Sequence, residues 1–166
     1  MNNNELGELH RARLARARPR ETAHVLNGGS GNPTLLRLIE RPGAHIGAHV
    51  WPGGQVLLDY LLEAGGTFEG SLRGATVLEL GSGVGLLGLS LAGSARARGA
   101  RVVVTDRDAG ILRHNCEANR AVFAANGEAT CTARELDWDR PALLLETDRP
   151  VDWILGADVL YNSNTA

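Results

Sequence analysis

Residues 77–88 read VLELGSGVGLLG, an apolar run that ends in an acid and continues into four closely spaced glycines. A turn that contains Gly81, Gly83 and Gly85 has no Cβ atoms at these positions, so a ligand can lie against its backbone. Free N–H groups at the start of the following helix would point toward that ligand. The pattern predicts a strand-to-helix turn that binds a nucleotide-like molecule, with an ordinary glycine-rich helix cap as the alternative.

The chain around this turn alternates between strand-like and helix-like segments. Apolar, β-branched runs predict strands at 75–80, 101–106, 129–138 and 151–161, and helices are expected at 85–99 and 109–123, with a partly helical segment at 139–150. This alternation is typical of a parallel sheet with right-handed crossovers. We therefore expect an α/β fold with a Rossmann-like, doubly wound parallel sheet.

The segment ahead of this core divides into an arm and a short extension. Residues 1–33 carry five arginines between positions 11 and 20 and then a Gly/Asn/Ser-rich stretch, so we expect a flexible arm, with the core at 34–166. Acids at the start of the arm disfavour an organelle-targeting peptide, and the absence of interleaved aromatics disfavours nucleic-acid binding. Residues 34–43 predict a strand and 54–66 an amphipathic helix.

Composition limits the class of protein. A chain of 166 residues, 43% hydrophobic, with a net charge of −2, predicts one soluble domain, and no apolar run reaches the roughly 20 residues of a membrane span. Cys116 and Cys131 lie outside metal or redox spacing, which favours a reducing compartment, the cytoplasm or the nucleus. His45, His49 and His114 have no ligand spacing, so no metal is expected.

Two acids help to identify the ligand. Residues 83–88 also fit the GxGxxG fingerprint of dinucleotide sites, so the glycines alone do not separate NAD from S-adenosylmethionine. Asp106 ends the next strand, where a carboxylate can accept the ribose hydroxyls of an adenosine. Glu79, two positions before Gly81, would repel a pyrophosphate but suits a cationic amino group or sulfonium. Charge favours S-adenosylmethionine.

Five segments together resemble a known family. GAHVWPGGQVLLDYL, VLELGSGVGLLGL, VVVTDRD, ELDWD and GADVLYN follow one another as in the seven-strand methyltransferases. The WP before the first helix, the DW after the third strand and the DVLY after the fourth resemble the protein-lysine methyltransferase branch, which includes the valosin-containing-protein lysine methyltransferase. The resemblance covers about residues 43 to 162 and implies transfer of a methyl group from S-adenosylmethionine to a lysine of a protein substrate.

The resemblance also implies roles for individual residues. The implied cofactor-binding residues are Trp51, Glu79, Gly81, Ser82, Gly83, Gly85, Asp106, Asp137, Trp138 and Ala157, with the ribose at Asp106 and the adenine near Trp138. Asp158 and Tyr161 are the implied catalytic residues at the pocket for the amine. Both tryptophans and Tyr161 could instead be packing residues, and Asp158 could cap a turn.

The family's sheet continues through three further strands that do not follow here. The resemblance implies the strand order 3-2-1-4 for the four strands present. A core that is incomplete at its C-terminus would then leave residues 151–157 as an exposed apolar edge strand, which we expect a partner chain to cover, unless the chain is a fragment. A non-catalytic cofactor-binding or interaction fragment is therefore one alternative function. A NAD-binding oxidoreductase domain is another.

Overall fold

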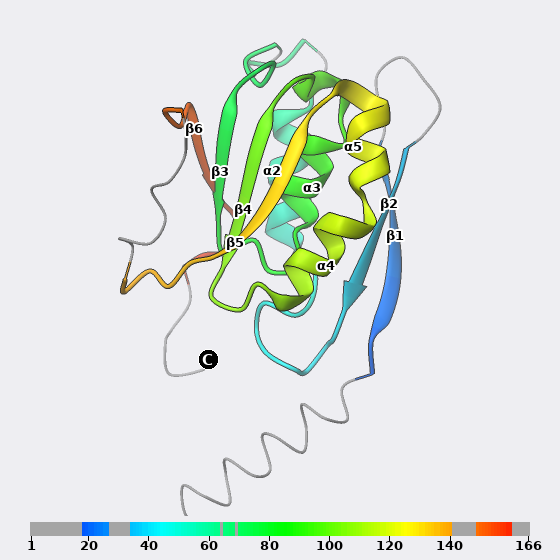
Figure 1. Ribbon diagram of the computed structural model, residues 1–166, viewed down its shortest axis with the longest axis vertical. Coiled ribbons are helices and arrows are strands. Elements are labelled where there is room, and N and C mark those ends of the chain that lie inside the picture. Colours follow the sequence, from blue (N-terminus) through cyan, green and yellow to red (C-terminus); the bar gives the residue numbers. More distant parts are fainter. Residues whose placement is uncertain (1–17, 27–33, 64, 69, 141–148, 161–166) are drawn as a thin grey trace, which may run out of the picture.

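The computed structural model describes residues 18–26, 34–63, 65–68, 70–140 and 149–160 (Figure 1). Its strands are β1 (Arg20–Leu26), β2 (Thr34–Glu40), β3 (Thr76–Leu80), β4 (Arg101–Asp106), β5 (Thr130–Glu135) and β6 (Trp153–Gly156). Its helices are α2 (Pro52–Leu61), α3 (Leu86–Ala92), α4 (Gly110–Ala118) and α5 (Arg120–Gly127), with a short 3-10 turn η1 (Ala95–Ala97).

Four parallel strands form the main sheet in the order β5-β4-β3-β6. This order confirms the predicted 3-2-1-4 arrangement and the Rossmann-like α/β class. Because the strands are parallel, their carboxyl ends lie at one edge of the sheet. That edge brings together the turn after β3, Asp106 at the end of β4, and the segments that follow β5 and β6 (Figure 1).

The main core lies between the sheet and the helices. Side chains alternate between the two faces of each strand, so Val77, Val102 and Val104 point toward the helices and are almost fully buried. Leu112 of α4 and Phe123 of α5 join the same cluster. The opposite face of the sheet carries a smaller cluster formed by Leu78, Leu80, Val103, Leu136 and Val151.

Helix α3 packs closely on the sheet because residue 88 is glycine. A Cβ on Gly88 would lie 2.3 Å from Val104 Cγ1 and 2.5 Å from Glu79 Oε2, far inside contact distance. Gly54 in α2 is different, since a Cβ there would meet only Leu86 Cδ2 at 3.9 Å. The two helical glycines therefore provide a matched pair of positions for a substitution to alanine, one without space for a methyl group and one with it.

Gly88→Ala is expected to destabilise the fold by roughly 1–2 kcal/mol, because overpacking outweighs the gain in helix propensity. Gly54→Ala is expected to stabilise it by about 0.5–1 kcal/mol, since the new methyl group fits and restricts the unfolded chain. Urea unfolding of both variants and the wild type measures the two changes. Equal effects of the two substitutions would contradict this account of Gly88.

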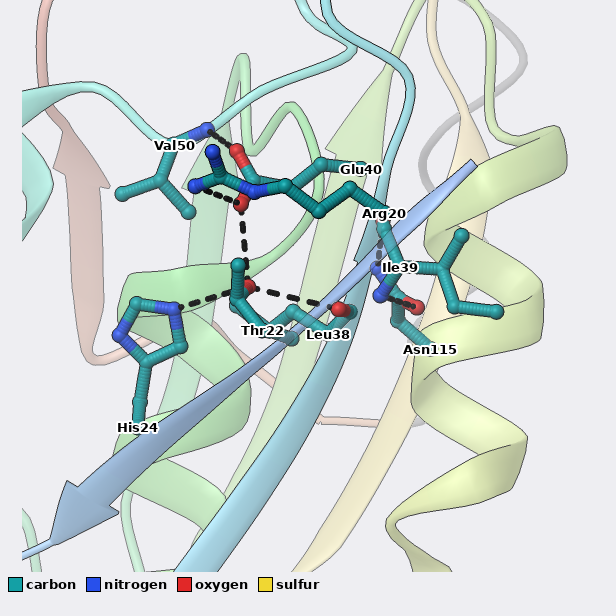
Figure 2. A network of polar contacts seen from close by, with 8 residues as sticks. All are labelled: Arg20, Thr22, His24, Leu38, Ile39, Glu40, Val50 and Asn115. Carbon is teal, nitrogen blue, oxygen red and sulfur yellow. Dashed lines mark hydrogen bonds and ion pairs between the residues drawn. The ribbon is translucent and has the colours of Figure 1, made fainter. Parts of the chain in front are cut away.

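The expected flexible arm over residues 1–33 is wrong for Arg20–Leu26, which forms β1. This strand pairs antiparallel with β2, and the hairpin lies along α4 and α5, at the side of the molecule away from β6 (Figure 1). Its inward-facing residues are Thr22 and His24, so the strand has no apolar alternation to reveal it. Both side chains lie in a polar network with Glu40 (Figure 2).

Several predicted elements are shorter in the structure. The helix expected over 109–123 is two helices that meet at Asn119, and the one expected over 85–99 is α3 followed by η1. Ser94 ends that continuity, because its hydroxyl accepts a hydrogen bond from Arg96 N at 3.2 Å. Most of the partly helical segment predicted at 139–150 lies outside the described residues.

Candidate active site

The turn after β3 requires glycine at two positions. Gly81 and Gly83 have φ angles of 64° and 56°, in the left-handed region that favours glycine. A Cβ on Gly83 would lie 2.9 Å from the carbonyl oxygen of Gly47, and one on Gly81 would lie 3.1 Å from Trp138 Cζ2. The bare backbone predicted from the sequence is therefore present and closely surrounded.

Asp106 faces this turn, as the sequence predicts. Its Oδ2 accepts a hydrogen bond from Gly83 N at 2.8 Å, and its Oδ1 accepts one from Asp108 N at 3.3 Å. Ser82 lies beneath the turn, because its Oγ accepts from Thr105 N at 3.1 Å. Thus the Asp106 carboxylate lies at the surface of the turn, whereas the Ser82 hydroxyl connects the turn to β4.

Glu79 lies on the helix side of the sheet, with 3% of its surface exposed. Its Oε2 accepts a hydrogen bond from Gly88 N, in the first turn of α3, at 2.9 Å. Burial raises the pKa of this carboxyl to about 7; hydrogen bonds from Ser82 and Gly88 oppose the rise, and the charge of Asp106 adds to it. A role of Glu79 toward a cationic ligand stays a prediction.

The raised pKa of Glu79 predicts that stability falls as the pH rises from about 4.5 to 7. In that interval the carboxyl is ionised in the unfolded chain but protonated in the folded one, so the unfolded state binds fewer protons. The slope should approach roughly 1 kcal/mol per pH unit. Glu79→Gln keeps an acceptor for Gly88 N and removes this slope, measured by urea unfolding across the interval.

The control is Glu135→Gln, the same replacement at an exposed acid that ends β5, and the slope that Glu79 produces should persist in this variant. Identical pH profiles for the wild type and Glu79→Gln would show that Glu79 titrates normally.

Trp138 and Asp137 follow β5 at the same edge of the sheet. Trp138 is 44% exposed, which disfavours the alternative that it is a core residue, and its ring lies against Gly81. Asp137 accepts a hydrogen bond from Asp139 N at 3.1 Å and lies 4.0 Å from Arg140 Nε. The structure therefore brings Trp138 to the glycine turn and places Asp137 in the loop beside it.

Trp51 and Asp158 meet at the start of α2. Trp51 is 42% exposed, its ring centroid lies 4.4 Å from that of His49 in a tilted arrangement, and its Nε1 donates to Ile46 O at 2.9 Å. Asp158 has a φ of 56°, and its Oδ2 accepts from Gly53 N at 2.8 Å. The Asp158 carboxylate thus caps α2, the structural role that the sequence left open, and this edge position is also compatible with contact to a substrate.

The remaining predicted residues have different outcomes. Gly85 begins α3 at a φ of 93°, and Ala157 is partly buried against the main core, directly after β6. Tyr161 lies outside the described residues. Among the residues that the structure does describe, no group of three metal-ligating side chains occurs.

Sequence reasoning missed Gly47, which the structure places against the glycine turn. Its carbonyl oxygen lies beside Gly83, and a Cβ on Gly47 would lie 3.4 Å from Asp106 Oδ2. Because Gly47 lies so close to Gly83 and Asp106, the backbone of the loop before α2 packs directly against the glycine turn. The available signal was its place at the start of GAHVWPGG, four residues before Trp51.

Comparisons with known proteins agree with this geometry. A family model described as lysine methyltransferase matches residues 30–166. Over 124 residues the chain is 37% identical to protein N-lysine methyltransferase METTL21A of Mus musculus, an alignment that covers 72% of this chain and 50% of that protein. Methyltransferase-like protein 22 of Homo sapiens is 36% identical over 74% of this chain and 30% of its own length.

A yeast relative extends the match. Protein-lysine N-methyltransferase EFM6 of Saccharomyces cerevisiae is 32% identical over 169 aligned residues, which cover 86% of this chain and 65% of that protein. The chain thus spans between about a third and two thirds of the length of these relatives. Among the described helices, none has the length and apolar character needed to cross a bilayer.

Proposed function

The chain belongs to the lysine methyltransferase family, and from this premise we propose that it binds S-adenosylmethionine and transfers its methyl group to a lysine side chain of a protein. The observation that carries the proposal is the glycine turn faced by the Asp106 carboxylate at the carboxyl edge of the sheet. The similarity to the protein-lysine methyltransferases METTL21A and EFM6 supports lysine as the acceptor.

The residues at this edge fit the two ends of S-adenosylmethionine. Gly81 and Gly83 present backbone where a Cβ would collide, as a turn that closely approaches the methionine part requires. Asp106, whose oxygens already accept two backbone N–H bonds, is suited to accept the ribose hydroxyls. The half-exposed ring of Trp138 offers a flat apolar surface for the adenine.

When bound, S-adenosylmethionine would supply a methyl group on a positively charged sulfur. An amine would attack the methyl carbon directly, and the sulfur would leave as the thioether of S-adenosylhomocysteine. The protein therefore contributes mainly alignment of the reacting groups. A lysine amine with a pKa of about 10.4 must first lose its proton, which costs roughly 4 kcal/mol at neutral pH. We assign Asp158 to orienting this amine, because its carboxylate is anchored on α2 by Gly53 N.

The remaining proposals concern partners and location. In the described part of the chain β6 pairs only with β3, and Ile154 on it is 64% exposed, which supports a further strand or partner chain at this edge. The free thiols Cys116 and Cys131 favour a reducing compartment, and we propose the cytoplasm. Fractionation of cells that express the tagged protein tests this location.

Calorimetric titration with S-adenosylhomocysteine, the product form of the cofactor, tests the cofactor. We expect micromolar binding and no heat of binding with NAD, which separates the methyltransferase from an oxidoreductase. Transfer of labelled methyl groups to proteins in a cell lysate, followed by mass spectrometry of lysines, then tests the reaction. Binding of NAD in place of S-adenosylhomocysteine would overturn the proposed function.

A further inference from the structure

Two buried asparagines, one helical turn apart, hold strand β2 against α4. The Asn115 side chain accepts from Ile39 N at 2.8 Å and donates to Ile39 O at 3.1 Å (Figure 2). The Asn119 side chain accepts from Arg37 N at 3.0 Å and donates to Arg37 O at 2.7 Å. Each amide therefore takes the place of a neighbouring strand along this edge of β2.

The two asparagines differ in their second donated hydrogen bond. Asn119, at the junction of α4 and α5, donates from Nδ2 to the backbone carbonyl of Asn115 in α4, at 2.7 Å. Asn115 Nδ2 donates instead to the carbonyl of Val84, in the glycine turn, at 2.9 Å. Asn115 is thus a single fully buried side chain that joins α4, β2 and the turn.

Val84 is the residue of the turn that most needs such support. It lies between Gly83 and Gly85, both at positive φ, and glycine backbones are the least restricted by their own sterics. A buried hydrogen bond to the Val84 carbonyl restricts this segment, and its donor cannot rotate away because Ile39 holds it on two sides.

The same anchor connects the turn to the segment that carries Trp51. Ile39 is followed by Glu40, a buried carboxylate whose Oε2 accepts from Val50 N at 2.8 Å (Figure 2). Val50 immediately precedes Trp51, the residue at the start of α2. A continuous series of bonds therefore runs from the glycine turn through Asn115 and β2 to the N-terminal side of the site.

We propose that Asn115 is a positioning residue that holds the glycine turn in its binding conformation and aligns it with the Trp51 segment. The part of this inference that concerns cofactor affinity rests on the proposed function. A turn that is ordered in advance loses less entropy when it binds, so removing the anchor weakens affinity without removing any contact to the ligand. Asn119, which holds β2 in the same way, lacks this role.

The variants Asn115→Asp and Asn119→Asp form a matched pair. Aspartate has the shape of asparagine and keeps an acceptor for the strand N–H, but whether ionised or protonated it retains at most one of the two donors. Both variants should lose comparable thermal stability, because each weakens a similar tether on β2. Only Asn115→Asp loses the bond to the glycine turn.

Titration with S-adenosylhomocysteine should show about tenfold weaker binding for Asn115→Asp, the cost of one lost hydrogen bond. Asn119→Asp should stay within twofold of the wild type. Without any ligand, the amides of residues 81–88 should exchange with deuterium about tenfold faster in Asn115→Asp than in Asn119→Asp. Equal affinities and equal exchange in the two variants would overturn the proposal.

A measurement on the wild-type protein tests the proposal even if one of the variants does not fold. On saturation with S-adenosylhomocysteine, the side-chain amide resonances of Asn115 should shift more than those of Asn119, and equal shifts would contradict the proposal. If the wild type fails to bind this ligand, the proposed function fails. The exchange comparison without ligand still tests whether Asn115 orders the turn, so the two failures are distinguishable.

Discussion

Asp158→Ala is expected to lower methyl transfer roughly 1000-fold, while the affinity for S-adenosylhomocysteine changes less than twofold. The carboxylate follows β6 and accepts its hydrogen bond from Gly53 N at the start of α2, not from the turn that would hold the cofactor. Its loss should therefore affect the alignment of the amine and the cap of α2, while the glycine turn keeps its hydrogen bonds. Transfer of labelled methyl groups to lysate proteins, relative to the wild type, measures the effect.

Asp158→Asn separates chemistry from capping. Asparagine keeps an oxygen acceptor for Gly53 N and tolerates the φ of 56° at this position. We expect the stability of this variant to match the wild type and its methyl transfer to remain low, because a neutral amide does not orient an amine as a carboxylate does. Normal turnover in Asp158→Ala would remove Asp158 from the mechanism and leave it only as a helix cap.

Asp106→Ala is expected to weaken binding of S-adenosylhomocysteine about 100-fold. Hydrogen bonds to a charged acceptor contribute about 1.5–3 kcal/mol each, and the carboxylate would lose those to the ribose. The carboxylate also accepts from Gly83 N at 2.8 Å, so the variant loses a contact that orders the turn. Calorimetric titration gives the affinity, and urea unfolding gives the separate change in stability.

Glu135→Ala is the matched control for Asp106. Glu135 ends the neighbouring parallel strand β5, in register with Asp106. Its side chain is exposed and forms an ion pair with Arg113, at 3.7 Å between Arg113 Nη2 and Glu135 Oε2. Exposed pairs contribute little, so affinity and stability should both stay near the wild type. If Asp106→Ala binds as tightly as Glu135→Ala, Asp106 does not hold the ribose.

The parallel sheet and the glycine turn at its edge could be predicted because their signals are local. The apolar strands, the glycine turn and the acid that ends β4 each occupy a few consecutive residues. The strand order 3-2-1-4 was implied by the resemblance to the seven-strand methyltransferases, and the structure has it. Strand β1 could not be predicted in this way. Its inward side chains, Thr22 and His24, are polar. Their partial burial is favourable because Thr22 donates to Glu40 on β2 and shares a hydrogen bond with His24 (Figure 2).

The sequence by itself determined the fold class, the glycine turn and the position of Asp106 at the edge that faces it. Only the tertiary structure decided that Asp158 caps α2 through Gly53, 105 residues away, and that Asn115 reaches Val84 across 31 residues. The period of the apolar residues and the spacing of the glycines predict the conformation of a segment, because that conformation depends largely on residues that are neighbours along the chain. A hydrogen bond between distant segments depends on how their elements pack, and that packing is set by the whole core.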